Sequence, residues 1–326
     1  MKGSDVIISS EAGIGHISLN RPNALHALTL GMCRDMIVAL QNWETDPAIT
    51  EITIDHSEGR GFCAGGDIRQ LYEALKVGDE SVLQFFRTEY QLNHLLFTYR
   101  KPTTCVMDGI VMGGGAGIAM PCRKRIATAA TQFAMPETSI GLIPDVGGSR
   151  SLSRLPGRVG EWLALTGARL NGPQCVDLGL ADTYVSKVSS AYMQSSIPRG
   201  DIDWLFAGDS LEDIIARLRS ESSDFAKEQL NLVSKNSPMS CKVALRLLRE
   251  GRKLDDFADN LRMEFRVVAR LLQHSDILEG IRAYIIEKDN APYWKPSNSN
   301  EVSEAEIDAI FAPLPPTEEW TPLDGR

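Results

Sequence analysis

The chain has 326 residues, of which 43% are hydrophobic and 24% charged, and its formal net charge is −9. This composition is typical of a folded globular protein and excludes a collagen-like or wholly disordered chain. The acidic balance without a long Lys/Arg run argues against nucleic-acid binding. The longest charge-free stretch, 14 residues over 109–122, is too short to span a membrane.

The predicted elements of the first half alternate between strands and helices. Alternating apolar residues predict a strand or hairpin over 6–20, and Thr29 is placed to cap a helix that runs to about residue 45. Short strands over 52–54 and 104–107 are each followed by a glycine-rich loop and then by a helix, the first of which is expected to start near Asp67. A longer helix fits 81–99. This alternation predicts an α/β architecture with crossover connections.

The second half has a different character. Four segments carry helical periodicity with few strand signals, namely 211–219, 239–250, 255–273 and 276–288. Prolines from residue 292 onward predict a loop-rich tail. We therefore expect an α/β core over 1–200 and a mainly helical region over 201–326.

Cysteine and histidine usage indicates the compartment and the chemistry. The six cysteines are scattered without a Cys-x-x-Cys pair, so reduced thiols are expected rather than a disulfide framework. The five histidines never fall at metal-ligand spacing, so no metal site is predicted. The first residues lack the apolar core of a targeting peptide, and we expect a cytoplasmic protein.

Two glycine clusters are the first candidates for chemistry, one over 63–67 (CAGGD) and one over 112–117 (MGGGAG). Neither matches a nucleotide-binding loop, because the second cluster lacks the Gly-Lys-Ser/Thr ending of a P-loop and has Ile118 at the last glycine position of Gly-x-Gly-x-x-Gly. Two loops that aim backbone N–H groups at one point would form an oxyanion hole. The alternatives are a flexible loop capped by Asp67 and a tightly packed helix start.

Three carboxylates are the next candidates. Glu137 and Asp145 each follow a proline among apolar neighbours, which is compatible with a helix cap and also with a partly buried acid/base pair. Glu89 lies in the apolar stripe of the 81–99 helix, four residues after Phe85. It either reaches solvent or a neighbouring arginine at the edge of the stripe, or points into a cleft as a functional group.

Taken in order, these motifs resemble the crotonase superfamily, also called the enoyl-CoA hydratase/isomerase family. The resemblance covers most of the chain and rests on 19–25 (LNRPNAL), the two glycine clusters, 134–138 (AMPET), 144–148 (PDVGG), 165–167 (LTG) and 179–182 (GLAD). The segments 85–90 (FFRTEY) and 279–283 (EGIRA) are most similar to a branch of the family that hydrolyses thioesters. This resemblance implies a spiral of β-β-α turns with a helical C-terminal region.

The resemblance also implies the roles of the site residues. The backbone N–H groups of Gly66 and Gly114 would hold the thioester carbonyl oxygen. Ala24, Leu25 and Ala64 would line the path of coenzyme A, and Arg60 would contact a phosphate. Coenzyme A would be part of the substrate, so no separate cofactor is expected.

Gly117 separates the activities that the family contains. Hydratases of the family use two glutamates, one at the position of Gly117 and one at that of Glu137. This chain keeps only the second and gains Asp145 where hydratases usually have a small residue. This pattern is similar to that of the hydrolases, in which Glu137 would attack the thioester or activate water.

In the same interpretation, Asp145 would position the substrate or water and assist proton transfer, and Glu89 would bind a 3-hydroxyl group. The expected substrate is a short-chain 3-hydroxyacyl-CoA such as 3-hydroxyisobutyryl-CoA, an intermediate of valine breakdown. The alternatives are an enoyl-CoA isomerase or hydratase and an acyl-CoA-binding protein without catalysis. The expected partner is the small-molecule substrate, with no nucleic acid or membrane, and the family resemblance allows a homo-oligomer.

Overall fold

The computed structural model describes residues 4–186 and 197–323. Its strands form two sheets, one of six strands in the order β1-β2-β3-β5-β7-β10 and one of four strands in the order β4-β6-β8-β9. The larger sheet contains β1 (Val6–Glu11), β2 (Ile14–Leu19), β3 (Glu51–His56), β5 (Thr103–Met107), β7 (Lys124–Thr128) and β10 (Thr183–Val185). The smaller contains β4 (Gly61–Cys63), β6 (Ile110–Met112), β8 (Gln132–Ala134) and β9 (Leu170–Asn171).

From β3 to β8, successive strands go alternately to the two sheets, which is the observation that defines the spiral. The chain passes from β3 to β4, from β5 to β6 and from β7 to β8, and each pair places one strand in the larger sheet and the next in the smaller. Because β4, β6 and β8 pair in parallel, their carboxyl ends lie at the same edge of the smaller sheet. The predicted spiral of β-β-α turns is therefore confirmed, as is the predicted N-terminal hairpin, in which β1 and β2 pair antiparallel.

Seven helices precede residue 187 in the described part of the chain; the first four lie where the sequence predicts them, and the last three were not predicted. The seven are α1 (Leu30–Thr45), α2 (Ile68–Lys76), α3 (Ser81–Phe97), α4 (Gly114–Ala119), α5 (Gly148–Ser151), α6 (Val159–Thr166) and α7 (Gly172–Asp177). The side chain of Thr29 accepts a hydrogen bond from the Met32 amide, and that of Asp67 accepts one from the Gln70 amide, so both residues are N-caps. Single-turn 3₁₀ helices lie at Pro22–Ala24 and at Glu137–Ile140.

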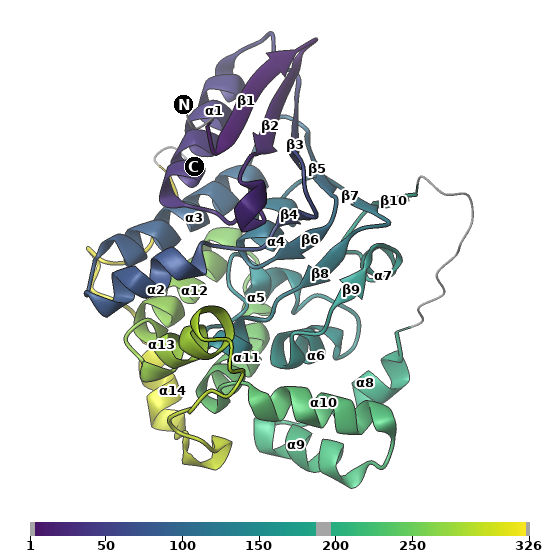
Figure 1. Cartoon of the computed structure of the whole chain (residues 1–326), viewed down its shortest axis with the longest axis vertical. Coiled ribbons are helices and arrows are strands. Elements are labelled where there is room, and N and C mark those ends of the chain that lie inside the picture. The colour runs from purple at the N-terminus through teal and green to yellow at the C-terminus, as the bar shows by residue number, and fades with distance from the viewer. Residues whose placement is uncertain (1–3, 187–196, 324–326) are drawn as a thin grey trace.

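Every described element from residue 199 on is helical, and Figure 1 shows these helices below and beside the sheets. They are α8 (Arg199–Leu205), α9 (Leu211–Ser220), α10 (Asp224–Lys235), α11 (Pro238–Gly251), α12 (Phe257–Leu271), α13 (Ser275–Ile281) and α14 (Glu304–Phe311), with a π-helical turn at Arg282–Ile286 and a 3₁₀ turn at Ser299–Glu301. Helix α12 packs on α3 and α11 packs on α6. The C-terminal helices thus cover the α/β core; its division at residue 200 stays a prediction.

The structure corrects two parts of the sequence-based prediction. The segment α10 was not predicted as a helix, although Ser223 caps it, because its apolar positions are interrupted by polar residues. The proline-rich tail was predicted as loops, yet it contains α14, which a reciprocal Ser303–Glu306 capping box stabilises. Local capping outweighs the neighbouring prolines there.

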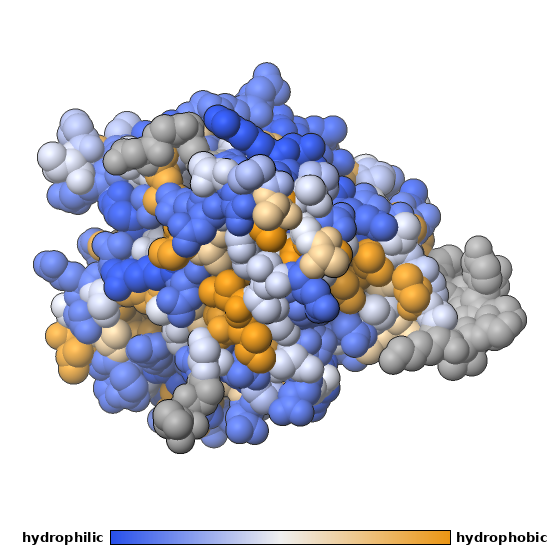
Figure 2. Space-filling view, turned by 90° about the horizontal axis from the view of Figure 1, so that it is seen from above, coloured by the Kyte–Doolittle hydropathy of each residue, from blue (hydrophilic) through white to orange (hydrophobic). Residues whose placement is uncertain are grey.

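One face of the molecule is shown in Figure 2, where hydrophilic side chains predominate and apolar ones form small patches. Within 4–186 and 197–323, no helix has the length and apolar character needed to cross a bilayer.

Candidate active site

Three loops meet at the edge where the parallel strands of the smaller sheet end. Strand β4 leads into Ala64–Gly66, β6 into the glycines that begin α4, and β8 into Glu137. Ligands of parallel sheets are bound at the carboxyl ends of the strands, where successive loops converge. The spiral therefore brings together Gly66 and Glu137, which are 71 residues apart in sequence.

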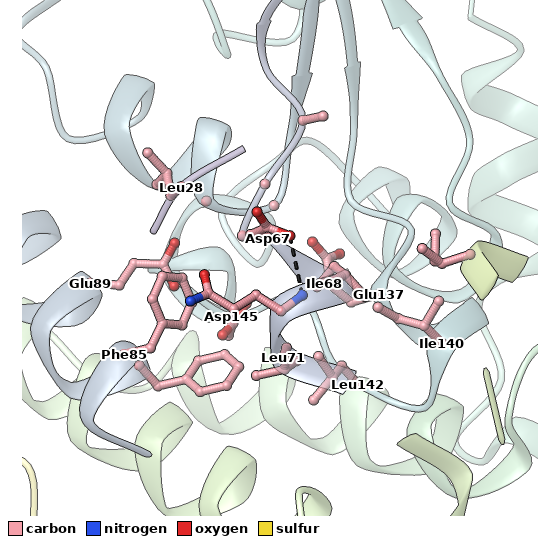
Figure 3. A pocket seen from close by; sticks show the side chains of 18 of the residues that line it. Leu28, Asp67, Ile68, Leu71, Phe85, Glu89, Glu137, Ile140, Leu142 and Asp145 are labelled. Atoms are coloured by element: carbon pink, nitrogen blue, oxygen red, sulfur yellow. Dashed lines mark hydrogen bonds between the residues drawn. The ribbon is translucent and has the colours of Figure 1, made fainter. Parts of the chain in front are cut away.

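A cavity of about 370 Å³ lies at this edge (Figure 3). Its wall includes Gly66, Gly114, Glu89, Glu137 and Asp145, each singled out from the sequence. Most other lining residues are apolar, namely Leu28, Leu30, Ile68, Leu71, Ala74, Val82, Phe85, Phe86, Met112, Ile140, Leu142 and Ile285. A concave apolar site with a few converging polar groups is the usual form of a small-molecule site.

Glu137 is the first residue of the 3₁₀ turn after β8, and its side chain is buried. Its oxygen Oε1 lies close to Gly113, where a Cβ atom would come within 3.0 Å of it. Gly113 has φ +47° and ψ −121°, a conformation that residues with a side chain rarely adopt. The other oxygen, Oε2, has no hydrogen-bond partner in the described structure. Glu137 thus lines the cavity with one buried carboxyl oxygen unpaired.

Glu89 projects from α3 toward the same cavity and is only 2% exposed. Its oxygen Oε1 has no hydrogen-bond partner among the described residues, and a Cβ atom on Gly114 would lie 2.2 Å from it. The adjacent arginine does not pair with it, because Arg87 donates to the carbonyls of Glu318 and Glu319. The interpretation of Glu89 as a solvent-facing or arginine-paired residue is therefore wrong, and a buried acceptor faces the glycine loop.

Asp145 lies in the segment between the 3₁₀ turn and α5, and it is not a helix cap. Its Oδ2 accepts a hydrogen bond of 2.6 Å from the hydroxyl of Tyr90, which is fully buried on α3 next to Glu89. Sequence reasoning missed Tyr90, because a tyrosine among apolar helix residues is indistinguishable from a core residue. The contact joins α3 to the loop of Asp145.

Burial of three carboxyl groups in one cavity governs their ionisation. Burial raises the pKa of Glu89 well above its ordinary value, and the nearby Asp145 and Glu137 raise it further. Burial, and then Asp145, also raise the pKa of Glu137. Burial raises the pKa of Asp145 to about 6, against the opposing effect of the Tyr90 hydrogen bond. Such a set ionises stepwise as one coupled system, a property typical of acid/base sites.

The amides of Gly66 and Gly114 lie on neighbouring loops at the cavity wall. The carbonyl of Gly65 and the amide of Asp67 both bond to Leu28, so the amide of Gly66 between them points away from Leu28. Gly114 is the first residue of α4, where an amide has no intrahelical acceptor. A Cβ atom on Gly65 would lie 3.7 Å from the Gly114 nitrogen, which places the loops in contact. Their role as oxyanion donors stays a prediction.

Gly117 has no room for a side chain. A Cβ atom there would lie 2.7 Å from Cβ of Val146 and 3.0 Å from Nδ2 of Asn93. Val146 follows Asp145 and has φ +51°, which is a strained conformation for a β-branched residue. The residue after Asp145 therefore fills the space that a side chain at 117 would need.

Glu264 is a further buried carboxylate that sequence reasoning missed. From α12 it accepts hydrogen bonds from the amides of Gly147 (2.8 Å) and Ser149 (2.9 Å), on the segment that follows Asp145. Burial raises the pKa of Glu264 to about 8. Glu89 was chosen as a candidate because it is an acidic residue within the apolar pattern of a helix. Glu264 lies in the apolar pattern of α12 in the same way, so the same criterion could have identified it.

Of the residues expected to bind coenzyme A, only one lines the cavity. Ala64 lines the cavity, and its amide donates to the carbonyl of Leu25 at 3.0 Å. Ala24, Leu25 and Arg60 are not part of the cavity wall; Arg60 is exposed. Their assignment to coenzyme A stays a prediction. Within the described ranges, no three His, Cys, Asp or Glu side chains form a group suited to a metal ion.

Comparison with known families adds an independent line of information. The model of the family described as enoyl-CoA hydratase/isomerase matches residues 14–200 and 187–311. Among curated proteins, the chain is 37% identical to "3-hydroxyisobutyryl-CoA hydrolase, mitochondrial" of Gallus gallus, over 95% of this chain and 89% of that protein. It is 38% identical to the protein of the same name from Homo sapiens, with the same coverage.

Solved structures give the same architecture. A carnitinyl-CoA dehydratase from Mycobacterium thermoresistibile superposes with a TM-score of 0.92 at 36% identity, over 99% of this chain and 100% of that chain. An enoyl-CoA hydratase from Rhodobacter sphaeroides 2.4.1 superposes with a TM-score of 0.91 at 36% identity, over 98% and 100%.

Proposed function

The chain belongs to the enoyl-CoA hydratase/isomerase family, and from this premise we propose that it hydrolyses the thioester of a short-chain 3-hydroxyacyl-CoA. The first candidate substrate is 3-hydroxyisobutyryl-CoA, because the curated relatives carry that name. The observation that carries the proposal is the combination of Glu89, Glu137 and Asp145 around one cavity with no space for a second acid at Gly117.

The first step of the proposed reaction is attack on the thioester carbonyl. The carbonyl oxygen lies between the amides of Gly66 and Gly114, which stabilise the negative charge that develops on it. The carboxylate of Glu137 adds to the carbonyl carbon, the C–S bond breaks, and coenzyme A leaves as a thiol after it takes up a proton. The product of this step is a mixed anhydride between the acyl group and Glu137.

The second step releases the acid. Water attacks the anhydride, Asp145 accepts or relays the proton of that water, and the Glu137 carboxylate is restored. The sum is thioester plus water giving carboxylic acid plus thiol. Direct attack of a water molecule activated by Glu137 gives the same products.

Glu89 supplies the proposed selectivity. Its unpartnered Oε1 lies beside the backbone of Gly114, next to the position of the carbonyl carbon, so it is placed to accept a hydrogen bond from a 3-hydroxyl group. A buried acceptor that is left unpaired by a substrate without the hydroxyl disfavours that substrate.

A second candidate is hydration of an enoyl-CoA, which the name of the similar enoyl-CoA hydratase favours. That reaction needs a second acid/base on the other side of the double bond, and the place of Gly117 is filled by Val146. The structure around Gly117 therefore favours hydrolysis.

The experiment tests a panel of acyl-CoA thioesters. A thiol reagent detects hydrolysis, and the loss of enoyl absorbance detects hydration. We expect free thiol from 3-hydroxyisobutyryl-CoA, less from isobutyryl-CoA, and no hydration of crotonyl-CoA. Hydration without thiol release would contradict the proposal and support the second candidate. Binding of acyl-CoA without either reaction would identify a non-catalytic binder.

Two further properties are part of the proposal. The six cysteines are buried free thiols, which supports a reducing compartment. The vertebrate relatives are named as mitochondrial, and the cytoplasmic location expected for this chain stays a prediction. The same holds for a homo-oligomeric state and for the absence of a separate cofactor.

A further inference from the structure

Tyr90 is the side chain that holds the Asp145 carboxyl group. Its hydroxyl donates to Oδ2 of Asp145 at 2.6 Å, within the range of a charge-assisted O–H···O⁻ hydrogen bond. The tyrosine ring is fully buried and meets Phe86 and Phe265 edge to face, with centroids 6.3 Å and 6.1 Å away. The ring is therefore fixed, and the direction of its hydroxyl is fixed with it.

We infer that Tyr90 is a positioning residue for hydrolysis: its hydroxyl keeps Asp145 ionised and turns Oδ1 toward the acyl group and water. This inference rests on the proposed function, and it adds a residue to the proposed catalytic machinery. Tyr90 itself does not line the cavity, so it acts through Asp145.

The backbone around Asp145 is held by a different residue, which makes the two contributions separable. Glu264 accepts hydrogen bonds from the amides of Gly147 and Ser149, and the Gly148 amide donates to the Asp145 carbonyl at 2.7 Å. Loss of the Tyr90 hydroxyl therefore leaves the loop anchored and changes the carboxyl group alone.

The surroundings of Asp145 explain why a donor is needed there. Glu89 on α3, Glu137 on the 3₁₀ turn and Glu264 on α12 all interact electrostatically with it. Burial favours the protonated form of Asp145, whereas the Tyr90 hydrogen bond and the bond to its own backbone favour the ionised form. Without the hydroxyl, the pKa of Asp145 rises, and the ionised form is populated only at higher pH.

The test is Tyr90→Phe, which removes one hydroxyl and keeps the ring. We expect the acid limb of the kcat/KM profile for 3-hydroxyisobutyryl-CoA to move up by about one pH unit. Since the pKa of Asp145 is about 6, the loss should be about fivefold at pH 6, approach tenfold toward pH 5 and be negligible at pH 8.5. The matched control is Tyr99→Phe, because the Tyr99 hydroxyl is also buried and donates at 2.6 Å, to the Leu40 carbonyl away from the cavity. That control should cost stability and leave the pH profile unchanged.

A second measurement is independent of catalysis. The titration midpoint of Asp145 is followed by NMR in protein with ¹³Cγ-labelled aspartate, with the resonance assigned by its loss in Asp145→Asn. A higher midpoint in Tyr90→Phe than in wild type supports the inference. An unchanged midpoint, or a loss of activity that is uniform with pH, overturns it. If wild type releases no thiol from any 3-hydroxyacyl-CoA, the proposed function fails, and the NMR midpoint still decides the role of Tyr90 toward Asp145.

Discussion

At the scale of single residues, the unusual feature is Glu89, a carboxyl group in a helix face that otherwise packs as core. Its Oε1 is buried without a partner beside the backbone of Gly114. Leaving a buried acceptor unpaired costs on the order of 1–3 kcal/mol, so a ligand hydroxyl that bonds to it gains a comparable amount. In the proposed function, Glu89 is thus the group through which the site would distinguish hydroxylated acyl groups.

Glu89→Gln is expected to reduce kcat/KM for 3-hydroxyisobutyryl-CoA by about 10- to 100-fold more than for isobutyryl-CoA. The amide keeps the shape of the side chain and replaces one acceptor oxygen by a donor. Glu80→Gln, at the exposed start of the same helix, is the control and should leave kcat/KM unchanged for both substrates. Equal losses for both substrates would remove the assigned role of Glu89.

At the scale of elements, helix α4 and the loop after Asp145 fit each other only with a glycine at 117. The strained Val146 occupies the neighbouring space, and Asn93 donates to the Gly117 carbonyl at 2.9 Å. The same contact that excludes a second acid thus fixes the loop that carries Asp145. Strain of this kind is stored at functional sites when the surrounding structure maintains it.

Gly117→Ala is expected to destabilise the fold by about 1–3 kcal/mol, although alanine is the better helix former, because its Cβ atom collides with Val146. Val146→Gly removes that collision, so the cost of Gly117→Ala should be at least about 1 kcal/mol smaller in the Val146→Gly background. Urea unfolding of the four proteins measures this coupling. Strictly additive effects would show that the two residues do not constrain each other.

At the scale of the whole molecule, four carboxyl groups buried on α3, α12 and the connecting segments oppose stability at neutral pH. Burial raises the pKa of Asp145 to about 6 and that of Glu264 to about 8, and it raises the pKa values of Glu89 and Glu137 well above 4.5. Unfolding restores ordinary values, so between pH 4 and 8 the unfolded chain binds fewer protons than the folded one. Protonation of these groups therefore favours the folded state fully below about pH 4, and this stabilisation is lost as pH rises toward 8.

Glu137→Gln should therefore raise the free energy of unfolding at pH 8, by on the order of 1–2 kcal/mol, and have little effect at pH 5. Denaturant titrations of wild type and variant at the two pH values measure the difference. A gain in the free energy of unfolding that is equal at both pH values, or larger at pH 5, would contradict this electrostatic effect of the cluster.

Much of the fold and of the site could be predicted from local pattern and motif order. The hairpin, the helix starts at Thr29 and Asp67 and the long helix of Glu89 all follow from periodicity and capping. What stayed hidden depends on long-range packing. Tyr90 matters because a loop 55 residues later meets it, and Glu264 because α12 folds back on that loop. No local pattern encodes either contact, although the position of Glu264 in the apolar pattern of α12 marks that residue itself as a candidate.

In the proposed mechanism, the Glu137 carboxylate attacks the thioester or activates water. Its contribution is measured by the rate of thiol release from 3-hydroxyisobutyryl-CoA by Glu137→Gln at pH 8, relative to wild type. We expect a fall of about 10³-fold or more, since nucleophile and base are lost together in a variant whose amide preserves the packing. Thiol release at the wild-type rate would show that Glu137 is not the catalyst.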